Sequence, residues 1–151
     1  MTQHRTEGRL TATHVLEYPY RRSVGTVMSR FFTGLGEQRI EGIRMRDGRV
    51  LVPPLEYDPA TSETLADFVE VGPGGMVTTW AWVVTPRPKH PLSHPFAWAL
   101  IRLDGADTAM LHAVDAGDPS RMRTGLRVRP RWREELVGEI HDIVCFEPEV
   151  A

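Results

Sequence analysis

Apolar side chains recur at helical spacing in the segment that begins at Ser23. They follow the order i, i+3, i+4, i+7, i+8 and i+11, which places all of them on one face of a helix. The apolar positions of this face are Val24, Val27, Met28, Phe31, Phe32 and Leu35. Ser23 is a suitable N-cap, and Gly36 predicts the C-terminal end of the helix. Two interpretations stay open: the face packs into the protein core, or Val27, Phe31 and Phe32 bind a partner or a ligand.

After about residue 64 the pattern changes to short apolar runs that are separated by Gly, Pro and Asp turns, which is typical of strands. The predicted strands are 66–71, 76–85, 96–103, 108–115, 125–133 and 139–146. The run at 96–103 is apolar on both faces, which predicts a central strand. Four prolines interrupt residues 86–95, so this segment is predicted to be an exposed loop. Strands of this length and spacing predict a mainly β fold with a small barrel.

Between the helix and the strands, residues 44–61 have the frame of a zinc ribbon without its cysteines. Two turns with CxxC-like spacing flank a Val-Leu-Val-Pro-Pro segment, and the four ligand positions hold Arg44, Asp47, Asp58 and Thr61. A structural zinc site needs four ligands that are usually thiolates or imidazoles, and arginine cannot bind a cation. We therefore expect no zinc here; that the two carboxylates bind another metal is the weaker alternative.

The same segment carries signals for a hairpin. Residues 40–43 and 50–52 are short apolar runs that predict two strands. Asp47-Gly48 and Asp58-Pro59 are sequences that favour turns.

Composition narrows the class of protein. The 151-residue chain suits one domain with at most a small appendage. Its formal charge of −2 gives no global field that attracts nucleic acid or an anionic membrane. The single cysteine, Cys145, excludes an intrachain disulfide, and no apolar run has the length of a membrane span. Residues 1–17 are polar and aperiodic, which predicts a mobile arm without a signal sequence. We expect a cytoplasmic protein.

Arginines alternate with apolar residues near the C-terminus. Arg127, Arg129, Arg131 and Arg133 fall at period two, which places them on one face of a strand. Such a row could bind the phosphates of coenzyme A or an acidic partner surface. The alternative is a solvated face with carboxylates nearby, such as Glu134 and Glu135.

Aromatic residues pair along two predicted strands, Trp80 with Trp82 and Phe96 with Trp98. Exposed aromatics beside basic residues stack on single-stranded bases in some barrels. The Val-, Ala- and Leu-rich context favours the alternative, that these side chains fill the barrel or a protein interface.

The remaining reactive side chains favour structural roles. His90 and His94 lie in a proline-rich loop that fixes no metal geometry. His112 is predicted to be a hydrogen-bonded histidine within a strand. His141 and Asp142 are strand neighbours that should point to opposite faces. Cys145 lies in an apolar run, where a thiol is usually inert.

Taken in order, several stretches resemble a family of bacterial and archaeal acyl-CoA-associated proteins. Its members consist of an N-terminal helical segment, a rubredoxin-like zinc ribbon and a C-terminal OB-fold. The matching stretches are 29–35 with 40–43, then 48–54, 69–77, and 95–105 followed by 124–128. The resemblance covers about residues 18–148, and the missing ribbon cysteines depart from the family pattern.

The resemblance implies an organisation and a role. It implies an arm (1–17), a helical segment (18–39), a degenerate metal-free ribbon (40–63) and an OB-fold domain with a five-stranded barrel (64–151). Family members resemble non-catalytic partners of thiolase-fold proteins that act on acyl-CoA esters. The branch most similar to this chain pairs with a steroid side-chain-cleaving aldolase.

From this resemblance we expect an accessory subunit of a hetero-oligomer that has no activity alone, with acyl-CoA as a ligand of the complex. The candidate partner- or CoA-binding residues are Val27, Phe31, Phe32, Trp80, Trp82, Arg127, Arg129 and Arg131. Two rivals stay open: a stand-alone acyl-CoA or lipid carrier, and a single-stranded nucleic-acid binder.

Overall fold

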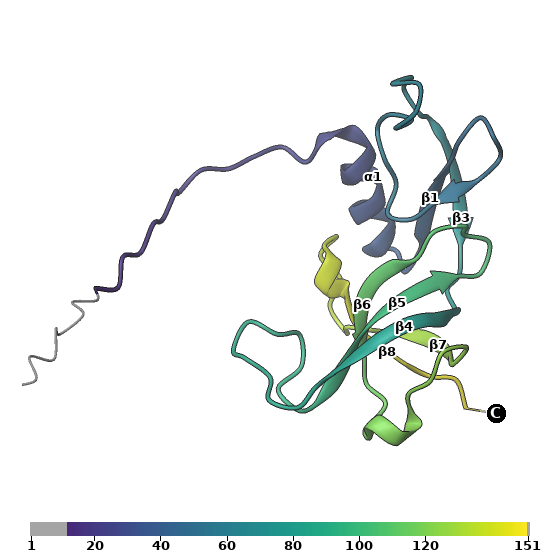
Figure 1. The fold of residues 1–151 in the computed structure, drawn as a ribbon. Helices are drawn as coiled ribbons and strands as arrows, with labels where there is room; N and C mark the ends of the chain where they lie inside the picture. Colours follow the sequence, from purple (N-terminus) through teal and green to yellow (C-terminus); the bar gives the residue numbers. More distant parts are fainter. Residues whose placement is uncertain (1–11, 151) are drawn as a thin grey trace, which may run out of the picture.

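The computed structural model describes residues 12–150, which form one α-helix, a three-stranded sheet and a closed five-stranded barrel (Figure 1). The elements are α1 (Gly25–Leu35), β1 (Ile40–Arg44), β2 (Val50–Leu51), β3 (Asp67–Val71), β4 (Gly75–Val83), β5 (Phe96–Leu103), β6 (Met110–Val114), the 3₁₀ helix η1 (Pro119–Arg121), β7 (Arg127–Trp132), the 3₁₀ helix η2 (Ile140–Asp142) and β8 (Ile143–Pro148). Among the described residues, no helix has the length and hydrophobicity that crossing a bilayer requires.

The predicted helix is present and ends where expected. Gly36 is its C-cap, and the Gly36 N–H donates to the Phe32 carbonyl oxygen at 3.1 Å. At the other end the prediction was one residue early: Val24 is the N-cap, and the Ser23 hydroxyl accepts a bond from the Gly25 N–H at 3.2 Å. Residues 12–24 before it are exposed and have no helix or strand. Of the predicted arm, residues 1–11 lie outside the described residues.

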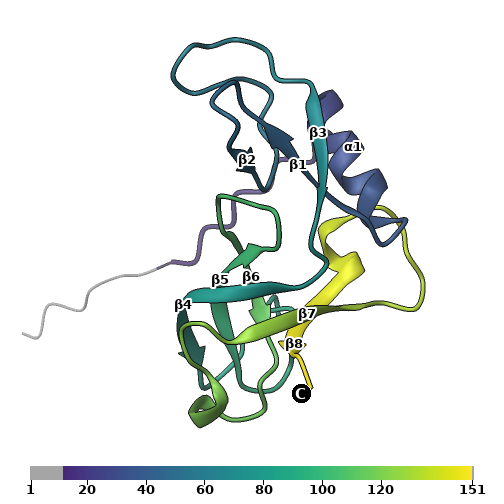
Figure 2. The ribbon, with the colours of Figure 1, turned by 90° about the vertical axis from the view of Figure 1, so that its right-hand side faces the viewer.

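The hairpin predicted in the ribbon segment is confirmed, because β1 and β2 pair antiparallel. The small sheet has the order β2-β1-β3 (Figure 2). The strand at 66–71 was predicted to be the first of the barrel, and this was wrong. All five residues of β3 pair with β1 instead, and Gly72, with φ of +71°, then turns the chain toward β4.

The barrel has the strand order β4-β5-β6-β8-β7 and is closed by pairing of β4 with β7. Neighbouring strands are antiparallel except β6 and β8, which meet in parallel at Val114 and Phe146. The predicted mainly β class with a five-stranded OB-fold barrel is therefore confirmed. The last strand begins later than predicted, because residues 140–142 form η2 and β8 starts at Ile143.

One apolar core connects the helix, the small sheet and the barrel. Phe31 and Leu35 of α1 pack in the same buried cluster as Val50 of β2 and Phe146 of β8. A smaller cluster, with Val27, Ile43, Met45, Leu51 and Leu65, lies between α1 and the sheet. The segments predicted from the sequence are thus parts of one packed structure.

Candidate ligand site on the barrel face

OB-folds bind ligands on the face of their second and third barrel strands, between the loop that joins strands one and two and the loop that joins strands four and five. In this chain the two strands are β5 and β6, and the two loops are residues 84–95 and 133–142. Figure 1 shows both loops on the same side of the barrel. They border a half-open pocket of about 290 Å³, lined by Lys89, Pro91, Trp98, Leu111, His112, Ile140, His141 and Ile143. We call this the barrel-face pocket.

The proline-rich loop packs back on the outside of the barrel. Leu92 is buried in a cluster with Phe96, Ala113 and Cys145. The His90 ring lies edge-on to Phe96 and Trp98, with centroid distances of 5.6 and 6.2 Å. The loop was predicted to be exposed, and this was wrong at Leu92, because apolar contacts hold this part of the loop beside the pocket.

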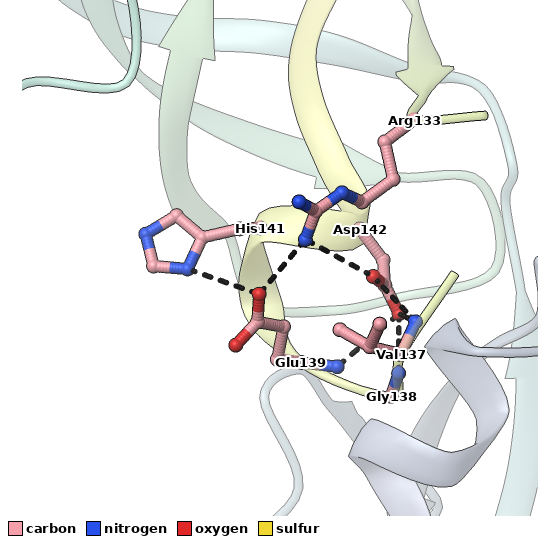
Figure 3. Close-up of polar contacts among 6 residues, drawn as sticks. All are labelled: Arg133, Val137, Gly138, Glu139, His141 and Asp142. Carbon is pink, nitrogen blue, oxygen red and sulfur yellow. Dashed lines mark hydrogen bonds and ion pairs between the residues drawn. The ribbon is translucent and has the colours of Figure 1, made fainter. Parts of the chain in front are cut away.

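On the other side of the pocket, Asp142 fixes the second loop (Figure 3). Its side chain is fully buried, and its carboxylate accepts bonds from the backbone N–H groups of Val137, Gly138 and Glu139, the shortest at 2.7 Å. Burial alone would raise the pKa of Asp142, but the backbone hydrogen bonds together with the charge of Arg133 lower it. The carboxylate therefore stays ionised and holds η2 in place.

The position of η2 brings Ile140 and His141 to the pocket wall. His141 and Asp142 were predicted as neighbours on a strand, and this was wrong because they belong to a 3₁₀ helix. The same loop packs on the C-terminal end of α1: a side chain at Gly138 would meet the Phe32 carbonyl oxygen at 3.4 Å. Asp142 thus supports both the pocket and the contact between loop and helix.

His112 and Cys145 have the structural roles predicted for them. The His112 ring is buried, accepts a bond from the Ala113 N–H at 2.9 Å, and packs edge-on to Phe146. Desolvation lowers the pKa of His112, so the ring is neutral near pH 7. Burial raises the pKa of Cys145 to about 11, so its thiol is not an activated nucleophile at neutral pH.

The arginine strip alternates in β7 as predicted, but each of its guanidinium groups meets carboxylates from other elements. Arg127 makes two bonds of 2.6 Å to Asp104 and further contacts to Glu149. Arg129 donates to Glu147 at 3.0 Å. The remaining contacts are Arg131 with Asp115 and Glu147, and Arg133 with Glu139 and Asp142. The carboxylates come from other turns and strands rather than from Glu134 and Glu135, and they offset the positive charge of the strip.

Arg127→Ala should lower the free energy of unfolding by about 1 kcal/mol, because Arg127 ties the β5–β6 turn to the C-terminal segment through a bidentate pair that solvent partly screens. Arg129→Ala, which removes one exposed contact, should cost less than about 0.5 kcal/mol. Urea denaturation of both variants measures the difference. Equal losses for the two variants would contradict this account of the strip.

The predicted partner residues on α1 are not equally accessible. Val27 and Phe31 are buried in the chain's own core, which agrees with the core interpretation and leaves them no surface for a partner in this conformation. Phe32 stays partly exposed. Trp80 and Trp82 are partly buried against the main core, which agrees with the interpretation that these side chains help to fill the barrel.

The four vestigial ribbon positions make turn and ion-pair contacts. Asp47 accepts from the Arg49 N–H and Asp58 from the Ala60 N–H, which confirms the predicted turn chemistry. Arg44 pairs with Asp67 at 3.2 Å, and the Thr61 hydroxyl donates to Glu63. Within residues 12–150, no group of three or more His, Cys, Asp or Glu side chains is arranged to hold a metal ion.

The barrel-face pocket was not predicted from the sequence, because the residues that line it come from four separate segments. Lys89 offered the best signal, since it is the only lysine in the chain and lies in a loop. Nothing local indicates that this loop meets Leu111 and Ile140 across the barrel.

Comparison with known proteins supports the fold. A DUF35-family protein of unknown function from Sulfolobus solfataricus is similar in structure, with a TM-score of 0.57 and 21% identity over 70% of this chain and 78% of that one. The structure described as the Ltp2-ChsH2(DUF35) aldolase matches with a TM-score of 0.60 and 22% identity, over 86% of this chain and 100% of that one. No curated protein matches significantly. Residues 68–133 match the family model described as the C-terminal OB-fold domain of ChsH2, so this part of the chain is similar to that domain.

Proposed function

We propose that this chain is a non-catalytic accessory subunit of a carbon–carbon-cleaving aldolase, in which it binds and supports a thiolase-fold partner that acts on acyl-CoA esters. The single observation that carries the proposal is the match to the full length of a chain in the structure named as the Ltp2-ChsH2(DUF35) aldolase. The family-model match across 68–133 supports it independently. The family resemblance of this chain favours a steroid side chain as the substrate of the aldolase complex.

The chemistry of the described side chains agrees with an accessory role. The Cys145 thiol is buried with a raised pKa, and the His112 ring is neutral and hydrogen-bonded within the chain. In this proposal the partner supplies the catalytic acid, base and most of the CoA site. Of the residues first considered for the interface, only Val27 and Phe31 are buried. The others keep accessible surface: Phe32, Trp80, Trp82, Arg127, Arg129 and Arg131.

The test is to combine the purified chain with the thiolase-fold subunit of an Ltp2-type aldolase. We expect no cleavage of a hydroxyacyl-CoA by this chain alone. The mixture should form a hetero-oligomer, detected by light scattering, and this complex should cleave the hydroxyacyl-CoA. An unrelated OB-fold protein is the control for non-specific stabilisation of the partner. Turnover by this chain alone, or failure to associate with thiolase-fold subunits, would overturn the proposal.

The interface can be tested within the same assay. Arg129→Ala combined with Arg131→Ala should weaken the complex several-fold if the strip is a partner contact, because the pair supplies exposed hydrogen-bond donors at the surface. Affinity by surface plasmon resonance, with the unfolding midpoint measured alongside, separates lost contact from lost folding.

A further inference from the structure

The barrel-face pocket has an apolar interior and a cationic rim. Trp98 and Pro91 are half-buried and Ile143 is fully buried in its wall. Leu111 is 60% exposed and Ile140 37% exposed, so both present apolar surface that a ligand would cover. At about 290 Å³ the pocket is at the small end of ligand sites, which span roughly 300–1,000 Å³.

The polar groups of the pocket favour a negative charge. None of its eight lining residues is acidic. Lys89 makes no ion pair within 4.0 Å across the described residues, whereas the arginines of the strip are paired. The carboxylate nearest to His141 is Glu139, at 3.9 Å, and Glu139 is already bound by Arg133 at 2.8 Å. The Lys89 ammonium is therefore left without an internal counter-charge.

We propose that the barrel-face pocket binds a small amphiphilic anion, whose apolar chain or ring packs on Trp98, Leu111 and Ile140 and whose anionic head lies beside Lys89. A lysine ammonium acts on such a head as a point charge, so a carboxylate and a phosphate monoester share the required chemistry. His141 offers a second polar contact at the rim. The site lies entirely within this chain, so it does not depend on the partner of the proposed function.

The chain provides its own reporter for this proposal. Reductive methylation with ¹³C-formaldehyde labels lysine side chains and the N-terminal amine while keeping their charge. Because Lys89 is the only lysine, the full-length protein gives one side-chain signal and one N-terminal reference signal. Titration with octanoate should move the Lys89 signal saturably and leave the reference in place. Octyl phosphate is the second anion, and 1-octanol is the neutral analogue of the same chain length.

Two variants and a matched control locate the ligand. Lys89→Glu should weaken octanoate binding about fivefold or more, because an exposed ion pair is replaced by repulsion. Leu111→Glu should do the same by placing a charge in the apolar wall. Leu100 is the cross-strand neighbour of Leu111 and also exposed, but it does not line the pocket, so Leu100→Glu should leave binding unchanged. Backbone amide shifts measure binding in all three variants.

These experiments test the pocket proposal on this chain alone, without the partner subunit. Saturable binding of either anion in preference to 1-octanol, weakened in the Lys89 and Leu111 variants but not in the Leu100 variant, supports the proposal. Equal affinity for octanoate and 1-octanol would overturn the inference that the ligand carries an anionic head. The absence of saturation, or an equal effect of the Leu100 and Leu111 variants, would overturn the site. These results leave the proposed function untouched, since that depends on assembly with the aldolase subunit.

Discussion

Phe31→Ala is expected to lower the free energy of unfolding by about 3–5 kcal/mol, the usual cost of truncating a fully buried phenylalanine. Phe31 is 1% exposed and packs in the core that the helix shares with the small sheet and the barrel. The removed ring would leave a cavity at the junction of these parts. Urea denaturation with tryptophan fluorescence measures the effect.

The fluorescent probe makes this prediction specific. All four tryptophans lie in barrel strands: Trp80 and Trp82 in β4, Trp98 in β5 and Trp132 in β7. A change in the helix can shift their transition only if the helix and the barrel unfold together. Unfolding of the helix before the barrel, with an unchanged fluorescence midpoint, would contradict the shared core.

Phe32→Ala is the matched control, because Phe32 is the next residue, has the same side chain and is only partly buried. It should cost clearly less than Phe31→Ala, since part of its ring already contacts water. If Phe32 is a partner contact, its replacement should weaken assembly more than folding. Equal destabilisation by the two variants would mean that the burial difference between them has no energetic consequence.

The apolar stripe of the helix shows what a sequence can decide. Its spacing predicted the helix, its end at Gly36 and the residues on one face, because these depend on local geometry. What covers that face depends on residues far along the chain, such as Val71 and Phe146, with which Phe31 shares a core. The choice between core and partner surface for Val27 and Phe31 therefore needed the structure.

The sequence also did not show which sheet a predicted strand would join. Residues 67–71 have the pattern of a strand wherever they pair, and their pairing with β1 rather than with a barrel strand is not encoded in that local pattern. The arginine strip was predicted correctly as one face of a strand. Its carboxylate partners were not the adjacent Glu134 and Glu135, and several lie far along the chain, such as Asp104, which is 23 residues from Arg127.

The barrel-face pocket was the hardest feature to predict, since one of its walls depends on a polar residue in an apolar context. Asp142 lies directly before the apolar run of β8, which suggested a continuous strand. Three backbone hydrogen bonds within its own loop instead compensate the burial of its carboxylate and form η2. Local side-chain capping thus competed successfully with strand propensity.

Asp142→Ala should lower the free energy of unfolding by about 2–3 kcal/mol, because it leaves part-buried N–H groups without an acceptor. Asp118→Ala is the matched control: Asp118 caps η1 through the Ser120 N–H, but it is exposed, so water can replace it at a cost of about 0.5–1 kcal/mol. The Asp142 variant should also weaken binding at the barrel-face pocket, since η2 carries Ile140 and His141.

The contribution of Asp142 should depend on pH in a defined direction. Its pKa is lower in the folded state than the value of about 3.9 expected when unfolded, so its ionised form stabilises the fold above that pH. As the pH falls below about 4 and approaches the lowered folded pKa, the unfolded state binds a proton first and this stabilisation is lost. Asp142→Asn cannot titrate, so the stability difference between wild type and this variant should shrink below about pH 4. Urea titrations at several pH values measure this difference, and a gap that stays constant down to the acid transition would show that the carboxylate charge does not hold the loop.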